Sequence, residues 1–212
     1  MAFTDLPLKR SAPLGVGAYV LGHLLTVATT GGRVGAVMDI AVAGEYADSA
    51  PLGQLLGVQP PSWVVGGWLF YNAHLVPTSV PTADAANGMA RLTNRSLLDS
   101  LGGPLLALYL LPPLLLAAAG YLVVRSGSTF GASGERNAGA SVAVGYVPAF
   151  VLGAFVFDAS AATASVTATP AGLSTIFFGL GYAVVFGAVG GMLAERRSGP
   201  ASDAPDGTVE TR

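Results

Sequence analysis

Charge is scarce in this sequence, and cysteine is absent. Lys, Arg, Asp and Glu together make up 10% of the 212 residues, whereas about 25% is usual for a soluble globular domain. A chain without cysteine forms no disulfide, no thiolate metal site and no thiol nucleophile. With 10 basic and 12 acidic residues the chain has no basic field that would attract nucleic acid, and we expect no nucleic-acid partner.

Long apolar runs take the place of the missing charge. The mean hydropathy is +0.60, and a helix crosses a bilayer core about 30 Å thick with roughly 20 apolar residues. Four runs approach or reach that length without an ionised side chain: 13–30, 104–124, 139–157 and 173–193. We therefore predict an all-α integral membrane protein built on a four-helix transmembrane bundle.

A fifth run, from Trp63 to Val76, decides the topology. It is shorter than a comfortable span and contains Asn72 and His74. Four crossings place seven of the ten basic residues on the side of both termini, whereas a fifth crossing divides them six to four at best. Because cytoplasmic loops are enriched in Lys and Arg, we predict four crossings in the cell membrane with both termini cytoplasmic.

The residues between the runs complete the expected organisation. We predict an N-terminal cytoplasmic segment 1–12, an outer segment 31–103, a cytoplasmic loop 125–138, an outer loop 158–172 and a disordered cytoplasmic tail 194–212. The aromatic residues of 63–71 and the alternating leucines of 92–101 are typical of segments at the membrane interface, so the outer segment is expected to lie on the outer leaflet. The first run follows Lys9 and Arg10 and is interpreted as an uncleaved signal anchor, with a cleaved signal peptide as the alternative.

Small residues recur at a spacing of four in three of the runs. Such stripes let helix backbones approach closely in a membrane, where van der Waals contact replaces the hydrophobic driving force. The composition alone could also produce them, because Gly, Ala, Ser and Thr are common here. The residues expected to pack helices are Ala18, Gly22, Gly145, Ala149, Gly153, Gly179, Ala183, Gly187 and Gly191.

Few side chains suggest chemistry. His23, Asn72 and His74 form the possible polar site, but no acidic residue accompanies them in a span, and a structural role is favoured. Pro112 and Pro113 indicate a possible kink. Without a phosphate-binding loop or a hydrolase motif, we expect no catalytic residue, metal or cofactor, and not an enzyme.

A possible modification site lies in the outer segment. Asn94, Arg95 and Ser96 form an Asn-x-Ser/Thr triplet, the acceptor sequence for N-glycosylation. Triplets of this kind are frequent by chance, and modification requires the outer location that the four-crossing topology predicts.

The segments 67–81, 108–123, 139–157 and 182–194 resemble a family of small haloarchaeal integral membrane proteins of unknown function, some of them loosely labelled transporters. The composition is similar to that of halophilic archaeal proteins, because every basic residue except Lys9 is arginine. The resemblance implies a membrane location and an archaeal source, and it assigns no substrate or catalytic residue.

Packing signals outnumber chemical ones in this chain. The leading hypothesis is a non-enzymatic structural or assembly component that associates with its own copies or with a membrane-protein partner. The alternative is a small-solute or ion transporter or channel, with His23 and the prolines at 112 and 113 lining a path.

Overall fold

Four long helices form the body of the molecule in the computed structural model, which describes residues 8–84, 91–126, 137–161 and 167–198. They are long and apolar enough to cross a membrane, which confirms the expected four long apolar helices. Their bounds are Leu8–Met38, Gly103–Arg125, Asn137–Ala154 and Gly172–Arg196. The first contains α1 (Leu8–Thr30), η2 (Gly31–Arg33) and α2 (Val34–Met38); the second η4 (Gly103–Leu110) and α6 (Leu111–Arg125); the third α8 (Ala143–Ala154); the fourth belongs to α9 (Gly172–Ser198).

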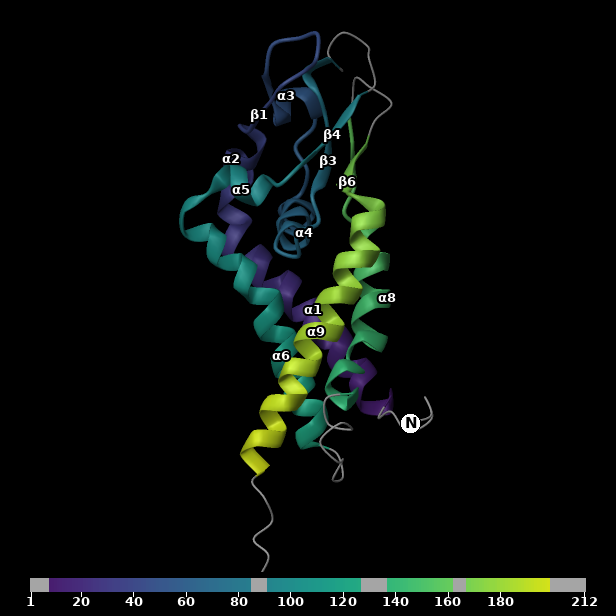
Figure 1. Cartoon of the computed structure of the whole chain (residues 1–212). Coiled ribbons are helices and arrows are strands. Elements are labelled where there is room, and N and C mark those ends of the chain that lie inside the picture. Colours follow the sequence, from purple (N-terminus) through teal and green to yellow (C-terminus); the bar gives the residue numbers. More distant parts are fainter. Residues whose placement is uncertain (1–7, 85–90, 127–136, 162–166, 199–212) are drawn as a thin grey trace, which may run out of the picture.

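The helices alternate in direction, so the two described ends of the chain lie at the same end of the bundle. Figure 1 shows the beginning of α1 and the end of α9 at this end, opposite a small folded head. The head comprises the described residues of 31–102 and 155–171. The described residues of the first and third connections lie in the head.

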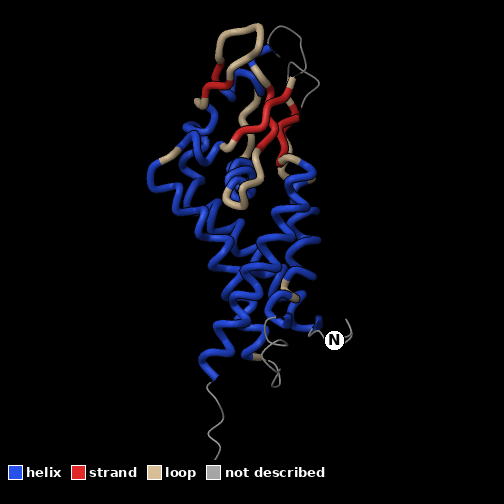
Figure 2. Tube along the Cα trace, in the orientation of Figure 1, coloured by secondary structure: helices blue, strands red, loops and turns tan. Residues whose placement is uncertain are grey.

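Two small antiparallel sheets in the head correct the all-α prediction (Figure 2). The first pairs β1 (Ala41–Val42) with β2 (Ala50–Pro51), and the second has the strand order β4-β3-β6-β5. Its strands are β3 (Thr78–Pro81), β4 (Leu92–Arg95), β5 (Ala159–Ser160) and β6 (Thr167–Pro170). In this sheet Thr78 lies opposite Pro170, so the first and third connections are joined by pairing. Such distant pairing leaves no local pattern in strands of two to four residues.

The Trp63 run forms α4 (Ser62–Asn72), and this helix is too short to be a fifth span. Its 11 residues extend about 16 Å at 1.5 Å per residue, roughly half of a bilayer core. After α4 the chain turns back through Leu75, which has a positive φ of 63°. Figure 1 shows α4 end-on where the bundle meets the head.

The aromatic side chains of α4 are in the protein core, which corrects their expected place at the membrane interface. Trp68, Phe70 and Tyr71 are fully buried, whereas Trp63 is half exposed. Of the leucines in 92–101, Leu97 and Leu98 of α5 (Leu97–Leu101) are also fully buried, whereas Leu92 is half exposed. The remaining short helix of the head is α3 (Leu52–Leu56). The head is therefore a packed unit on the end of the bundle.

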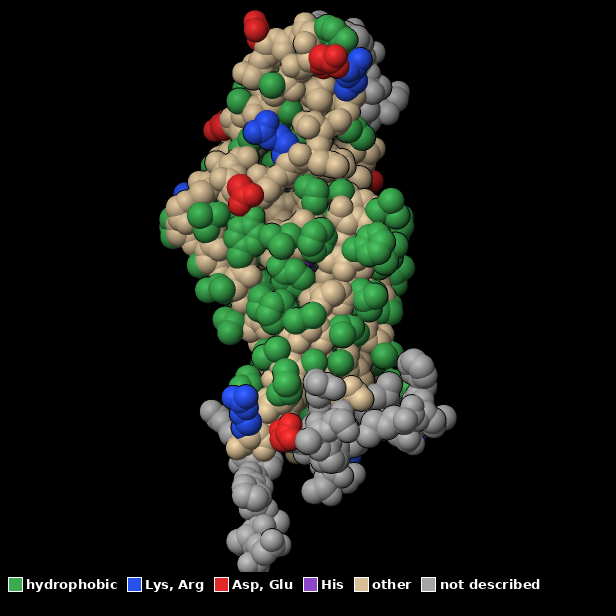
Figure 3. Space-filling view, viewed as in Figure 1, with side chains coloured by type: hydrophobic (Ala, Val, Ile, Leu, Met, Phe, Trp, Pro, Cys, Tyr) green, Lys and Arg blue, Asp and Glu red, His purple; other side chains and the backbone are tan. Residues whose placement is uncertain are grey.

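The outside of the bundle carries an apolar belt. Large hydrophobic side chains are exposed on each long helix, among them Leu24, Leu114, Leu152 and Phe177. Figure 3 shows this apolar surface around the middle of the bundle, with charged side chains at the head and at the opposite end. An apolar surface between two charged ends is compatible with insertion of the bundle into a membrane.

Candidate functional site

The most polar part of the buried interior lies where α4 meets α8. Trp68 donates a hydrogen bond from Nε1 to the carbonyl oxygen of Phe157 at 3.0 Å, and the Tyr71 hydroxyl donates to the carbonyl oxygen of Phe150. One acceptor, Phe150, lies in the C-terminal part of α8, and the other, Phe157, lies just beyond its end. Trp68 and Tyr71 of α4 thus bond to main-chain oxygens of α8 and of the segment directly after it, and these contacts fix α4 against that part of the chain.

His74 continues this contact just beyond the end of α4. Its Nδ1 lies 2.7 Å from the carbonyl oxygen of Phe70, and its Nε2 is hydrogen-bonded to the Tyr146 hydroxyl. Because a carbonyl only accepts, Nδ1 carries the proton, and Nε2 accepts the hydrogen bond that Tyr146 donates. Burial lowers the pKa of His74 to about 3, so the imidazole is neutral at physiological pH. Both ring nitrogens are thus occupied by structural hydrogen bonds.

Asn72 joins α4 to the head. Its Oδ1 accepts hydrogen bonds from the backbone N–H groups of Leu97 and Leu98, the first residues of α5, at 2.7 and 3.1 Å. Its Nδ2 donates to the carbonyl oxygen of Val76 and to the Thr78 hydroxyl. These four contacts use the hydrogen-bonding capacity of the amide and stabilise the start of a helix. The structure therefore gives Asn72 a positioning role between α4, α5 and β3.

His23 is apart from this hydrogen-bonded group. It is half-buried in α1, and its ring packs 4.7 Å from the ring of Phe157, measured between centroids. Its Nδ1 is buried and has no hydrogen-bond partner among the described residues. The aromatic rings of Phe157 and Phe70 separate it from the polar group around His74. The three residues of the expected polar site therefore form one pair, Asn72 and His74, and one separate histidine.

The small residues expected to pack helices lie at contacts within the chain. A Cβ atom on Gly145 would meet the backbone of Ala12 in α1, and one on Gly179 would meet the ring of Phe150. Gly187 faces Gly120 of α6 and Gly139 of the third long helix. The other expected packing residues are at least partly buried: Ala18, Gly22, Ala149, Gly153, Ala183 and Gly191. The close approach that glycine allows is used here inside one chain.

The two prolines expected to kink a helix lie in its first turn. Pro112 and Pro113 follow Leu111, the first residue of α6, at the point where the chain changes from 3-10 to α geometry. Proline is tolerated in a first turn because its missing N–H would have no helical partner there. The prolines therefore mark a helix start inside the second long helix.

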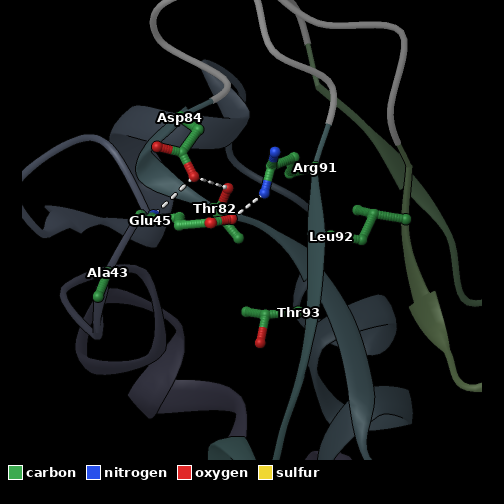
Figure 4. A pocket seen from close by; sticks show the side chains of 8 residues that line it. Ala43, Glu45, Thr82, Asp84, Arg91, Leu92 and Thr93 are labelled. Carbon is green, nitrogen blue, oxygen red and sulfur yellow. Dashed lines mark hydrogen bonds and ion pairs between the residues drawn. The ribbon is translucent and has the colours of Figure 1, made fainter.

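The head contains an open pocket of about 480 Å³, shown in Figure 4. Asp84 lies at its wall, fully buried, and its carboxylate accepts hydrogen bonds from the backbone N–H groups of Glu45 and Tyr46, both at 2.8 Å. The pKa of Asp84 is lowered most by the hydrogen bond from the backbone N–H of Glu45 and next by the one from Tyr46. Arg91, which also lines the pocket, forms an ion pair with Glu45 and lies over the ring of Tyr46.

The sequence did not indicate the roles of Asp84 and Tyr146. Asp84 is the acceptor for the backbone of the 43–46 loop, and Tyr146 is the hydrogen-bond partner of His74. An aspartate in the turn-rich stretch 77–87 is unremarkable, and its backbone donors lie 38 and 39 residues earlier. Tyr146 lies in an apolar run that gives no local sign of a polar contact, and the histidine that it contacts is 72 residues away. Among the described residues no group of three or more His, Cys, Asp and Glu could hold a metal ion.

These features define a bundle of four membrane-length apolar helices, closed at one end by a short buried helix and a small mixed head. The chain belongs to DUF7978, a family of unknown function whose model matches residues 2–198. No curated protein and no solved structure matches the chain.

Proposed function

We propose that this protein is a non-enzymatic structural or assembly component of the cytoplasmic membrane of a halophilic archaeon. Its four long helices cross the membrane, both termini are cytoplasmic, and the head lies outside. In this arrangement the bundle anchors the head, and the head is the part that meets a partner or a second copy.

The observation that carries the proposal is the closure of the bundle by α4. Its fully buried Phe70 and Tyr71 pack against Phe150 of α8, with ring centroids 4.3 Å apart for the Tyr71–Phe150 pair, and Tyr146 of α8 is hydrogen-bonded to His74 just beyond α4. The polar groups among them are hydrogen-bonded to the main chain or to each other. Side chains that act on a solute in a membrane normally face a water-filled cavity, whereas these stabilise a packed core.

The distribution of charge supports the sidedness. The end of the bundle opposite the head carries four described basic side chains: Lys9, Arg10, Arg125 and Arg196. The head has three arginines and six carboxylates in its described residues. Since basic residues are retained on the cytoplasmic side, the end opposite the head is assigned to the cytoplasm.

The packing of the glycine stripes bears on how the protein would associate. Gly145, Gly179 and Gly187 are occupied by contacts within the chain. Association is therefore assigned to the head and to the apolar outer belt. We therefore expect substitutions at these glycines to change the stability of the monomer and to leave the oligomeric state unchanged. Substitutions on the surface of the head should change the oligomeric state.

Transport is the second candidate, and His23 is the observation that favours it. An imidazole nitrogen without a partner among the described residues, in a helix of membrane length, could face a passing ion or solute. Its neighbours are aromatic rings rather than charged or hydroxyl groups.

Flux measurements separate the two candidates. The full chain is reconstituted in proteoliposomes beside its His23→Phe variant, and uptake of Na⁺, K⁺, Cl⁻, protons and small labelled solutes is compared with empty liposomes. The structural proposal predicts the same background flux in all three. Flux above the background that His23→Phe abolishes would overturn it and establish transport.

A further inference from the structure

Asn94 lies on the exposed edge of the head's larger sheet. β4 is the first strand in the order β4-β3-β6-β5, so one of its sides has no neighbouring strand among the described residues. The backbone N–H of Thr82 donates to the carbonyl oxygen of Arg91. Because residues of an antiparallel strand alternate between bonding to the neighbour and pointing away from it, the main-chain groups of Leu92 and Asn94 face outward. Leu92 itself is 50% exposed.

The Asn94 side chain is held with its amide nitrogen available. Asn94 is exposed, and its Oδ1 accepts a hydrogen bond of 2.6 Å from the Ser79 hydroxyl on β3. This contact fixes the carboxamide by its oxygen, which leaves Nδ2 directed away from Ser79. Oδ1 and Nδ2 are separate atoms of the carboxamide, so the contact of Oδ1 with Ser79 does not use Nδ2 of this exposed side chain.

The triplet around Asn94 is the only Asn-x-Ser/Thr triplet in the 212 residues. In the folded protein its hydroxyl group on Ser96 accepts a hydrogen bond from the backbone N–H of Asp99, as the N-cap of α5, and contacts the Tyr109 hydroxyl. Asn94 of the triplet thus lies on the exposed strand β4, whereas Ser96 is the N-cap of α5.

We propose that Asn94 carries an N-linked oligosaccharide, which rests on the proposed location of the head outside the membrane. The donor is an oligosaccharide linked through phosphate to a membrane lipid, and an oligosaccharyltransferase supplies the base. Nδ2 attacks the anomeric carbon; the Nδ2–carbon bond forms as the carbon–oxygen bond to phosphate breaks. Nδ2 loses one proton to the base, and the lipid phosphate leaves with the bonding electron pair.

The modification would have a physical role at this position. An exposed edge strand with unpaired main-chain groups can add a strand from another chain, and natural sheets block such edges. A glycan on Asn94 covers the outward-facing groups of both Asn94 and Leu92. It therefore directs association of the head away from this edge.

The test is mass spectrometry of the full chain, expressed in an archaeal host that attaches N-linked glycans to its surface proteins. We expect one glycan per chain, on the peptide that contains Asn94. Asn94→Gln should carry none. Two matched controls should keep the glycan: Ser96→Thr preserves the triplet and the cap, and Ser79→Ala removes the hydrogen bond to Asn94 but leaves the triplet intact.

A labelling measurement in the same cells separates this proposal from the proposed topology. Ser49→Cys places a thiol on an exposed head residue of a chain that has no other cysteine. If this thiol reacts with a membrane-impermeant maleimide in intact cells and Asn94 is unmodified, the glycan proposal alone is overturned. If the thiol is protected and Asn94 is unmodified, both the topology and the glycan proposal are overturned.

Discussion

The contact of α9 with its neighbours at Gly187 can be tested by one pair of substitutions. A Cβ atom on Gly187 would lie 2.7 Å from the carbonyl oxygen of Gly139 and 2.7 Å from Cγ2 of Val142. The backbone of α9 at Gly187 is also close to α6, because a Cβ on Gly120 of α6 would lie 2.9 Å from Cα of Gly187. Most of these neighbours are backbone atoms, which cannot move aside without shifting a helix. Gly187→Leu must therefore separate α9 from the third long helix.

The size of the effect follows from overpacking. Forcing additional methylene groups into a close-packed contact costs about 1–3 kcal/mol. For a chain of this size, each kcal/mol lowers Tm by roughly 2–4 °C, which gives a decrease of about 2–12 °C. Gly181 of the same helix provides the matched control, because a Cβ there would have no atom within 4 Å. Gly181→Leu should leave Tm unchanged or raise it slightly, since leucine favours a helix over glycine by about 0.5–1 kcal/mol.

The assay is thermal unfolding of both variants in detergent, followed by circular dichroism, with size-exclusion chromatography to determine the oligomeric state. We expect a lower Tm for Gly187→Leu alone and the same oligomeric state for both variants. Equal Tm values would refute the close contact at Gly187. A change of oligomeric state in Gly187→Leu, with Tm unchanged, would instead assign this glycine to association between copies.

Three further predictions concern the buried polar groups. Tyr146→Phe leaves Nε2 of His74 without its donor and should cost about 1–3 kcal/mol of unfolding free energy; combining it with His74→Phe should cost less than the sum of the single changes, which a double-mutant cycle in detergent measures. Burial holds the pKa of His74 at about 3, below its ordinary 6.5. Between pH 6.5 and pH 3 the imidazole therefore binds a proton in the unfolded chain but not in the folded one. The free energy of unfolding should fall as the pH is lowered through this window, by up to about 1.4 kcal/mol per pH unit. A His74→Phe variant with an equally steep dependence of Tm on pH between 7.5 and 5 would contradict this assignment. Asp84→Ala should expose the loop around residues 43–46 to limited proteolysis, because two backbone N–H groups lose their acceptor, whereas the exposed control Asp48→Ala should leave the cleavage pattern of the wild type.

The long helices could be predicted because membrane length and lack of charge are local properties of a sequence. Residues 104–124 are apolar regardless of what surrounds them, and they form most of the second long helix. The Trp63 run shows where this reasoning ends, since apolar aromatic residues are equally compatible with lipid and with a protein core. Only the packing of Phe70 and Tyr71 against α8 distinguishes the two environments.

The sheets and the polar contacts depend on residues far apart in the chain. Thr78 pairs with Pro170 across an intervening pair of long helices, and Asp84 binds backbone groups that precede it by almost forty residues. Neither contact changes the local spacing of apolar and polar residues. The sequence did indicate Asn72 and His74 as unusual, because an amide and an imidazole are costly inside an apolar stretch unless they are hydrogen-bonded. Their partners became identifiable only with the fold.

The central claim is that the head and the two termini lie on opposite sides of the membrane, and cysteine labelling tests it most directly. Ser49→Cys reports on the head, and Ser126→Cys reports on the exposed end of α6 at the opposite end of the bundle. In intact cells an impermeant maleimide should label Ser49→Cys, whereas Ser126→Cys should react only after the membrane is permeabilised. Labelling of both thiols in intact cells, or of Ser126→Cys alone, would contradict the topology.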